Sequence, residues 1–125
     1  MLSSRGYPGC MVADMKPSSG PLFDRAHLER YTGGDAALTA ELLGLMCDQA
    51  RRCIDLMAEA RDETAWQTAT HTLKGAARGV GAFALADMCE HAEAQPAAAW
   101  EGARLAVEHC FRETEAAFGD CARRS

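Results

Sequence analysis

Hydrophobic residues along the chain recur every three or four positions, which is the period of an amphipathic helix. The first such segment covers residues 22–31 and stops at Thr32-Gly33-Gly34, so we predict a short helix there. Its expected inward-facing residues are Leu22, Ala26, Leu28 and Tyr31.

A long amphipathic helix is predicted next, from an N-cap at Asp35 to about Arg61. The positions expected to face the core are Leu38, Leu42, Leu45, Met46, Gln49, Cys53, Leu56 and Ala60. Asp62 can then cap a third helix, which we expect to be interrupted near Gly79 and Gly81 because paired glycines lower helix propensity.

The third helix and the segments after it keep the same period. The third has its apolar stripe at Trp66, Ala69, Leu73, Ala76, Ala77 and Val80. A fourth starts near Ala82, ends at Pro96, and faces inward at Ala82, Leu85, Ala86, Cys89 and Ala92. A last helix has core positions at Trp100, Ala103, Val107, Cys110, Phe111, Thr114 and Phe118, with Gly119 as its expected stop.

Long helices with short joints favour an all-α fold, namely an antiparallel four-helix bundle with a short N-terminal covering helix. The 125 residues fit one domain. Residues 1–20 contain Gly, Pro and Ser without a hydrophobic period, so we expect a flexible N-terminal arm there and the bundle domain over 21–125.

Composition narrows the range of partners. A formal net charge of −5 argues against nucleic-acid binding, which needs clustered Lys and Arg. No apolar run approaches the roughly 20 residues that span a bilayer, and the N-terminus lacks signal-peptide order, so we expect a cytoplasmic protein without membrane contact. The 6 cysteines show no C-x-x-C pair, and we interpret them as reduced thiols at helical apolar positions.

Candidate chemistry gathers on the third helix. At about 100° per residue, His71 points away from the apolar stripe. Residues within about 60° of it are Thr64, Gln67, Thr68, Lys74, Gly75 and Arg78. Lys74 and Arg78 can bring cations toward an anion on the imidazole, and Gly75 leaves space for that anion. An exposed imidazole can act as a nucleophile near neutral pH, so we predict that His71 accepts a phosphoryl group.

The residues around His71 resemble the signature of histidine phosphotransfer (HPt) domains. The matching residues are His71-Thr72-Leu73-Lys74-Gly75-Ala76-Ala77, then Val80-Gly81-Ala82, with a similar Gly33-Gly34-Asp35 opening of the long helix. The resemblance covers about residues 22 to 120 and implies an HPt-like bundle in a two-component multistep phosphorelay. His71 would accept the phosphoryl group from a receiver-domain aspartate and pass it to another receiver.

The resemblance also implies roles for neighbours of His71. Lys74 would lie beside the phosphoryl group and Gly75 would leave access to it. Glu93 would orient the imidazole through its second nitrogen, with Glu90 as the reserve. Gln67, Thr68 and Arg78 would contact the partner, and Arg78 is a cation where relatives often have a smaller or neutral residue.

The expected partners are response-regulator receiver domains and a hybrid histidine kinase, and we expect the chain itself to be a monomer. It lacks a nucleotide-binding signature, so it would be a phosphocarrier without ATP-dependent kinase activity of its own. We expect no cofactor or metal in this chain, and we expect Mg²⁺ in the partner receiver.

Two other functions fit parts of the sequence. The same surface could dock and sequester a receiver or kinase without being phosphorylated, although a pure binder would not need the nucleophile. A metal site could use Cys89, His91 and His109 by residue type alone, although two of these residues are too close in sequence to share one helix face. For His27, His91 and His109 we expect no chemistry.

Overall fold

The computed structural model describes residues 22–124, with side chains up to residue 119, so the predicted arm over 1–20 lies outside the described residues. The elements are α2 (Arg25–Thr32), α3 (Ala36–Glu59), α4 (Glu63–Gly79), α5 (Phe83–Glu93), a 3₁₀ turn (Ala97–Ala99) and α6 (Trp100–Arg124). No strand occurs within this part of the chain. The predicted all-α fold is confirmed.

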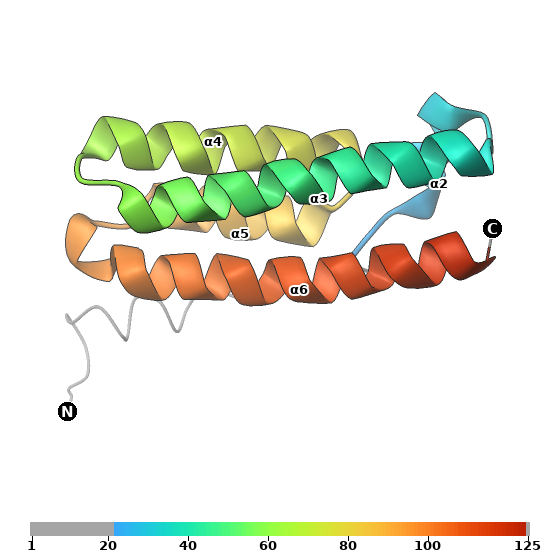
Figure 1. Cartoon of the computed structure of the whole chain (residues 1–125). Coiled ribbons are helices and arrows are strands. Elements are labelled where there is room, and N and C mark those ends of the chain that lie inside the picture. Colours follow the sequence, from blue (N-terminus) through green and yellow to red (C-terminus); the bar gives the residue numbers. More distant parts are fainter. Residues whose placement is uncertain (1–21, 125) are drawn as a thin grey trace.

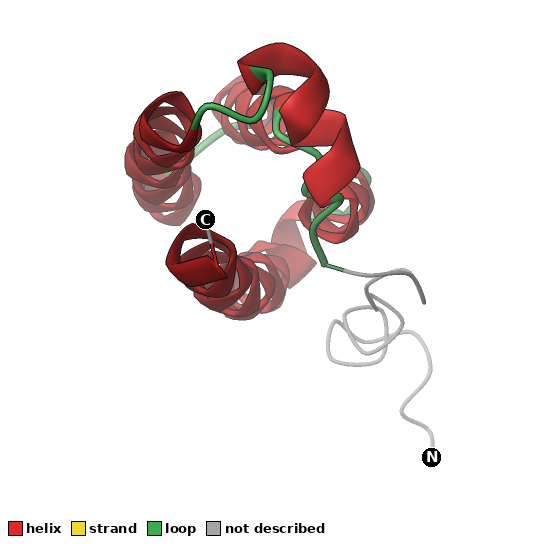
Figure 2. Ribbon diagram, turned by 90° about the vertical axis from the view of Figure 1, so that its right-hand side faces the viewer, coloured by secondary structure: helices red, strands yellow, loops and turns green. Residues whose placement is uncertain are grey.

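The four long helices run alternately up and down, so that neighbours along the chain are antiparallel (Figure 1). Each packs on the next, and α6 returns to pack on α3, which closes the bundle. Seen end-on, the short α2 lies across one end of the long helices (Figure 2). Within residues 22–124, no helix is long and apolar enough to cross a membrane.

Aspartate caps set where the helices begin. A side-chain oxygen of Asp35 accepts from the backbone N–H of Leu38 at 3.0 Å, and one of Asp62 accepts from that of Ala65 at 2.8 Å. Each bond satisfies an N–H that has no partner within the helix. Both predicted caps are confirmed. The cap at Asp62 begins α4 directly after the short loop that follows the end of α3 at Glu59.

The buried face of α4 is the one that the sequence predicts. Trp66, Leu73 and Ala77 are each at most 1% exposed. The indole N–H of Trp66 donates to the backbone oxygen of Ala92 on α5 at 2.9 Å, and its ring stacks on Trp100 with centroids 4.9 Å apart. These contacts fix the rotation of α4 about its axis, and with it the direction in which His71 points.

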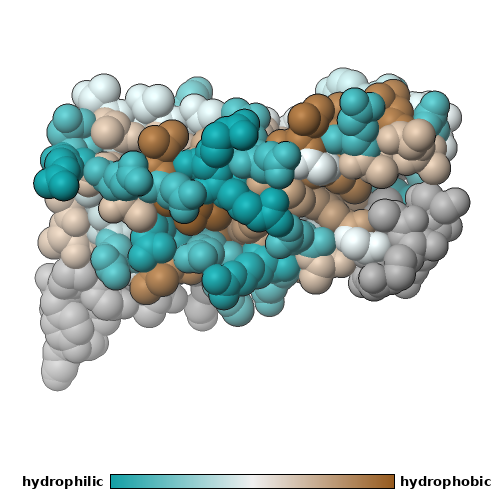
Figure 3. Space-filling view, viewed as in Figure 1, coloured by the Kyte–Doolittle hydropathy of each residue, from teal (hydrophilic) through white to brown (hydrophobic). Residues whose placement is uncertain are grey.

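Along α3 the predicted core face is partly wrong. Leu38, Leu45 and Leu56 are 38%, 59% and 54% exposed. Met46 and Cys53 are buried as predicted. The other residues that α3 buries were not predicted to face the core: Thr39, Leu43, Cys47, Ala50, Ile54 and Met57. The helix therefore carries two apolar stripes. The stripe that includes Leu43 packs into the core, and the stripe that includes Leu45 and Leu56 stays exposed. Apolar patches consequently remain among hydrophilic side chains on the molecular surface (Figure 3).

Two expectations at the ends of the bundle are also wrong. Ala26 and Tyr31 face solvent, Tyr31 being 66% exposed, and α2 makes its main core contact through Leu28, which is 1% exposed. The last helix does not stop at Gly119 but continues to Arg124. A single glycine costs a helix only about 1 kcal/mol, which is too little to end a helix supported by packing.

Candidate functional site

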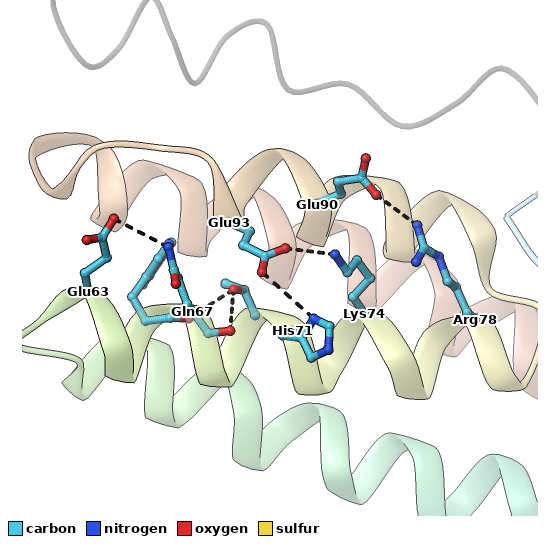
Figure 4. Close-up of polar contacts among 9 residues, drawn as sticks. Glu63, Gln67, His71, Lys74, Arg78, Glu90 and Glu93 are labelled. Carbon is cyan, nitrogen blue, oxygen red and sulfur yellow. Dashed lines mark hydrogen bonds and ion pairs between the residues drawn. The ribbon is translucent and has the colours of Figure 1, made fainter.

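His71 lies on the outer face of α4, with 73% of its side chain exposed. One turn further along the helix, a Cβ added to Gly75 would meet nothing within 4 Å. The glycine therefore does not serve a close helix crossing. The imidazole has open space on the side toward which α4 continues (Figure 4).

Lys74 and Glu93 form the closest polar contact beside the imidazole. The Nζ atom of Lys74 lies 2.8 Å from Oε1 of Glu93, which joins α4 to α5. The other carboxylate oxygen, Oε2, is 3.9 Å from Nδ1 of His71, which is ion-pair range and too long for a hydrogen bond. Glu93 thus lies between the ammonium group and one ring nitrogen, and it leaves Nε2 facing outward.

A second ion pair crosses from α4 to α5 further along. Arg78 Nη2 lies 2.9 Å from Oε1 of Glu90, and both side chains are more than half exposed. Figure 4 shows Lys74–Glu93 and Arg78–Glu90 as neighbouring links between the same two helices. Glu90 therefore contacts Arg78 and not the imidazole for which it was the reserve candidate.

The other predicted partner contacts lie on the opposite side of His71 along the helix. Gln67 and Thr68 are exposed, and the amide of Gln67 donates to Glu63 at 3.4 Å, one turn earlier. The strip from Glu63 to Arg78 is therefore polar and open. It presents the imidazole near its middle.

A model of the Hpt domain family matches residues 41–117 of the chain. The chain belongs to the Hpt domain family. The crystal structure of histidine phosphotransferase ShpA from Caulobacter crescentus matches with a TM-score of 0.62 and 36% sequence identity, covering 83% of this chain and 97% of that chain. No curated protein matches.

Family membership supports a phosphorelay role for this HPt domain, and it confirms the resemblance inferred from the motif around His71. Hpt domains act with receiver domains and kinases in such relays. The match extends over most of α3, α4 and α5 and reaches residue 117 in α6. The strip around His71 is therefore within the part that the family shares.

The alternative metal site has no support in the HPt domain. Cys89 is fully buried in the core, whereas the side chain of His109 is 77% exposed. No group of three or more potential metal ligands comes together within the described part of the chain. Burial also raises the pKa of the Cys89 thiol, which makes a metal-binding thiolate harder to form.

Sequence reasoning singled out residues that the structure brings together, but it missed two contacts between them. It identified Lys74 as a cation for the phosphoryl group and Glu93 as a partner of the imidazole, without the ion pair between them. The ion pair between Arg78 and Glu90 was missed as well. Spacing within one helix could not have predicted either pair, because each joins α4 to α5 across a glycine turn.

Proposed function

We propose that this HPt protein is a phosphocarrier in which Nε2 of His71 accepts a phosphoryl group from the aspartate of one receiver domain and passes it to another. The observation that carries the proposal is the exposed imidazole on an open polar strip, with a lysine and a glycine one turn away. A receiver can approach such a nucleophile from solvent without any rearrangement of the bundle.

The transfer step requires a particular proton arrangement on the ring. With the proton on Nδ1, the lone pair of Nε2 attacks phosphorus, the P–O bond of the aspartyl phosphate breaks, and the carboxylate remains on the receiver. The ring gains positive charge as the N–P bond forms. Glu93, 3.9 Å from Nδ1, favours the proton there and stabilises that charge. Transfer to the second receiver reverses these bond changes.

Lys74 and Gly75 would act on the phosphoryl group after it has arrived. A phosphoryl group brings about −1.5 to −2 charge at neutral pH. Lys74, three residues after His71 on the same helix, can turn part of its interaction from Glu93 to these oxygens. The space at Gly75 keeps the group accessible to the second receiver.

The HPt protein would supply no ATP chemistry and no metal of its own in this scheme. A divalent ion such as Mg²⁺ would be held by carboxylates of the receiver, where it would neutralise the phosphoryl oxygens during transfer. Transfer should therefore depend on Mg²⁺ that the receiver binds.

A direct test mixes the full chain with a receiver domain phosphorylated with labelled phosphate and follows the label on a gel. We expect the label to appear on the wild-type protein and to be absent from His71→Gln. The matched control is His109→Gln, because His109 is 77% exposed and distant in sequence. Labelling of His71→Gln, or no labelling of the wild type by any receiver of its organism, would overturn the proposal. In the second case, the docking function would account better for the surface.

A further inference from the structure

The ion pair between Arg78 and Glu90 lies on the surface beside His71. The side chains are 51% and 61% exposed, and their 2.9 Å contact links α4 to α5. The neighbouring Lys74–Glu93 pair is much less accessible, at 13% and 27%. A protein approaching His71 therefore meets the Arg78–Glu90 pair before it meets the inner one (Figure 4).

Stability does not account for the outer pair. Exposed ion pairs contribute about 0–1 kcal/mol, because water and salt screen them and ordering two long side chains costs entropy. The α4–α5 contact is already held by buried residues such as Trp66, which bonds to the backbone of Ala92. Arg78 and Glu90 are therefore free to exchange each other for groups on another protein at little cost to the fold.

The position of Arg78 relative to His71 places the pair within reach of a protein bound at His71. Arg78 follows His71 by seven residues, which is two turns, about 10 Å along the axis and nearly the same side of the helix. A receiver that brings an aspartate to the imidazole buries on the order of 800 Å² of each partner, if its interface is of standard size. A footprint of that size, centred on His71, includes a side chain 10 Å away.

We propose that Arg78 and Glu90 form a charge-ordered contact that selects the receiver, a step that rests on the proposed phosphocarrier function. The cation lies on the α4 side and the anion on the α5 side. The preferred receiver presents a carboxylate to Arg78 and a basic side chain to Glu90. A receiver with the opposite order meets like charges, which slows association and penalises docking.

The test uses the full-length variants Arg78→Glu, Glu90→Arg and the double exchange of both. The double exchange restores an ion pair between α4 and α5 but reverses its order on the surface. Exchange of Arg51 with Glu115 is the control, since that pair bridges α3 and α6 with comparable exposure of 53% and 38%. Each protein is loaded on histidine with phosphoramidate, and the loaded fraction is measured before mixing.

Loss of phosphoryl group to each receiver domain of the source organism is then followed at short times in the presence of Mg²⁺. Both single variants and the double exchange should transfer about tenfold more slowly to the receiver that the wild type prefers. The control exchange should transfer like the wild type.

Recovery of the wild-type rate in the double exchange would overturn the proposal, because the pair would then serve only to join the helices. Wild-type rates in the single variants would overturn it as well. Either result leaves the phosphocarrier function intact, since that function is tested separately, by transfer to and from the wild type and by the His71→Gln variant.

Discussion

Lys74 and Glu93 form a 2.8 Å ion pair that joins α4 to α5 directly beside His71. Neither side chain is free in solvent, since 13% of Lys74 and 27% of Glu93 is exposed. If one member of a mostly buried ion pair is removed, the charge of the other member is left unpaired, which costs free energy. The pair therefore contributes both to the stability of the bundle and to the electrostatics of the imidazole.

Replacing Lys74 alone should destabilise the bundle. In Lys74→Met the Glu93 carboxylate loses the ammonium group 2.8 Å away, and we expect the free energy of unfolding to fall by about 1–3 kcal/mol in urea denaturation. The control is Arg78→Met, whose exposed partner Glu90 is left in water and for which we expect a loss below about 1 kcal/mol. Equal losses would contradict a special cost at Lys74.

Replacing both members of the inner pair separates stability from transfer. Lys74→Met combined with Glu93→Leu leaves no unpaired charge, so its free energy of unfolding should return close to the wild-type value. Its phosphotransfer should stay about tenfold or more below wild type, because the groups around the imidazole are gone. A double variant that regains both properties would show that the pair has no part in the chemistry.

The sequence predicted α4 well because that helix carries a single apolar stripe. Trp66, Leu73 and Ala77 are buried as expected, and the opposite side is polar. On α3 the same reasoning failed, because Leu45 and Leu56 lie on one apolar stripe and Leu43 and other buried residues lie on another. Periodicity alone does not rank two such stripes. The choice depends on how α4 and α6 pack against α3, which is a tertiary effect.

The sequence likewise predicted one part of the candidate site and missed another. Exposure of His71 and the open space at Gly75 follow from positions within one helix, and the sequence predicted both. The pairing of Lys74 with Glu93 and of Arg78 with Glu90 depends on the register between two helices across a glycine turn. Helical spacing does not specify that register, so these contacts needed the structure.

Gly75 should lower the stability of the bundle slightly while it keeps the imidazole of His71 accessible. A Cβ there meets nothing within 4 Å, so Gly75→Ala should raise the free energy of unfolding by about 0.5–1 kcal/mol through higher helix propensity. A larger side chain, Gly75→Leu, should slow phosphotransfer by crowding the imidazole. Gly44→Ala on α3 is the control, since it also meets nothing within 4 Å and lies on another helix. Wild-type transfer rates in Gly75→Leu would contradict the role of this space.

Gly81 holds the covering helix at the turn between α4 and α5. Its φ is +86°, its carbonyl accepts from the N–H of Asp24 at 2.9 Å, and an added Cβ would lie 2.7 Å from the backbone oxygen of Asp24. Gly81→Ala should therefore lower the free energy of unfolding by about 1–3 kcal/mol or more, measured in urea. Gly79→Ala should have a much smaller effect, because a Cβ at Gly79 meets nothing within 4 Å. Similar losses in both variants would argue against this close contact.

The buried thiols should make the bundle less stable at alkaline pH. Burial raises the pKa of Cys110 from 9.0 to about 11, and burial raises that of Cys89 as well. Between pH 9 and 11 the unfolded chain would lose these protons while the folded chain keeps them, so the free energy of unfolding falls as pH rises. Below pH 9 both states keep the protons, and the thiols contribute no pH dependence.

Urea denaturation at pH 7, 9 and 10 should show this decline in the free energy of unfolding, and the variant with Cys89→Ala and Cys110→Ala should show a smaller decline. The two proteins differ only at Cys89 and Cys110, so the difference between their slopes isolates these two thiols, and equal slopes would show that burial does not control their ionisation.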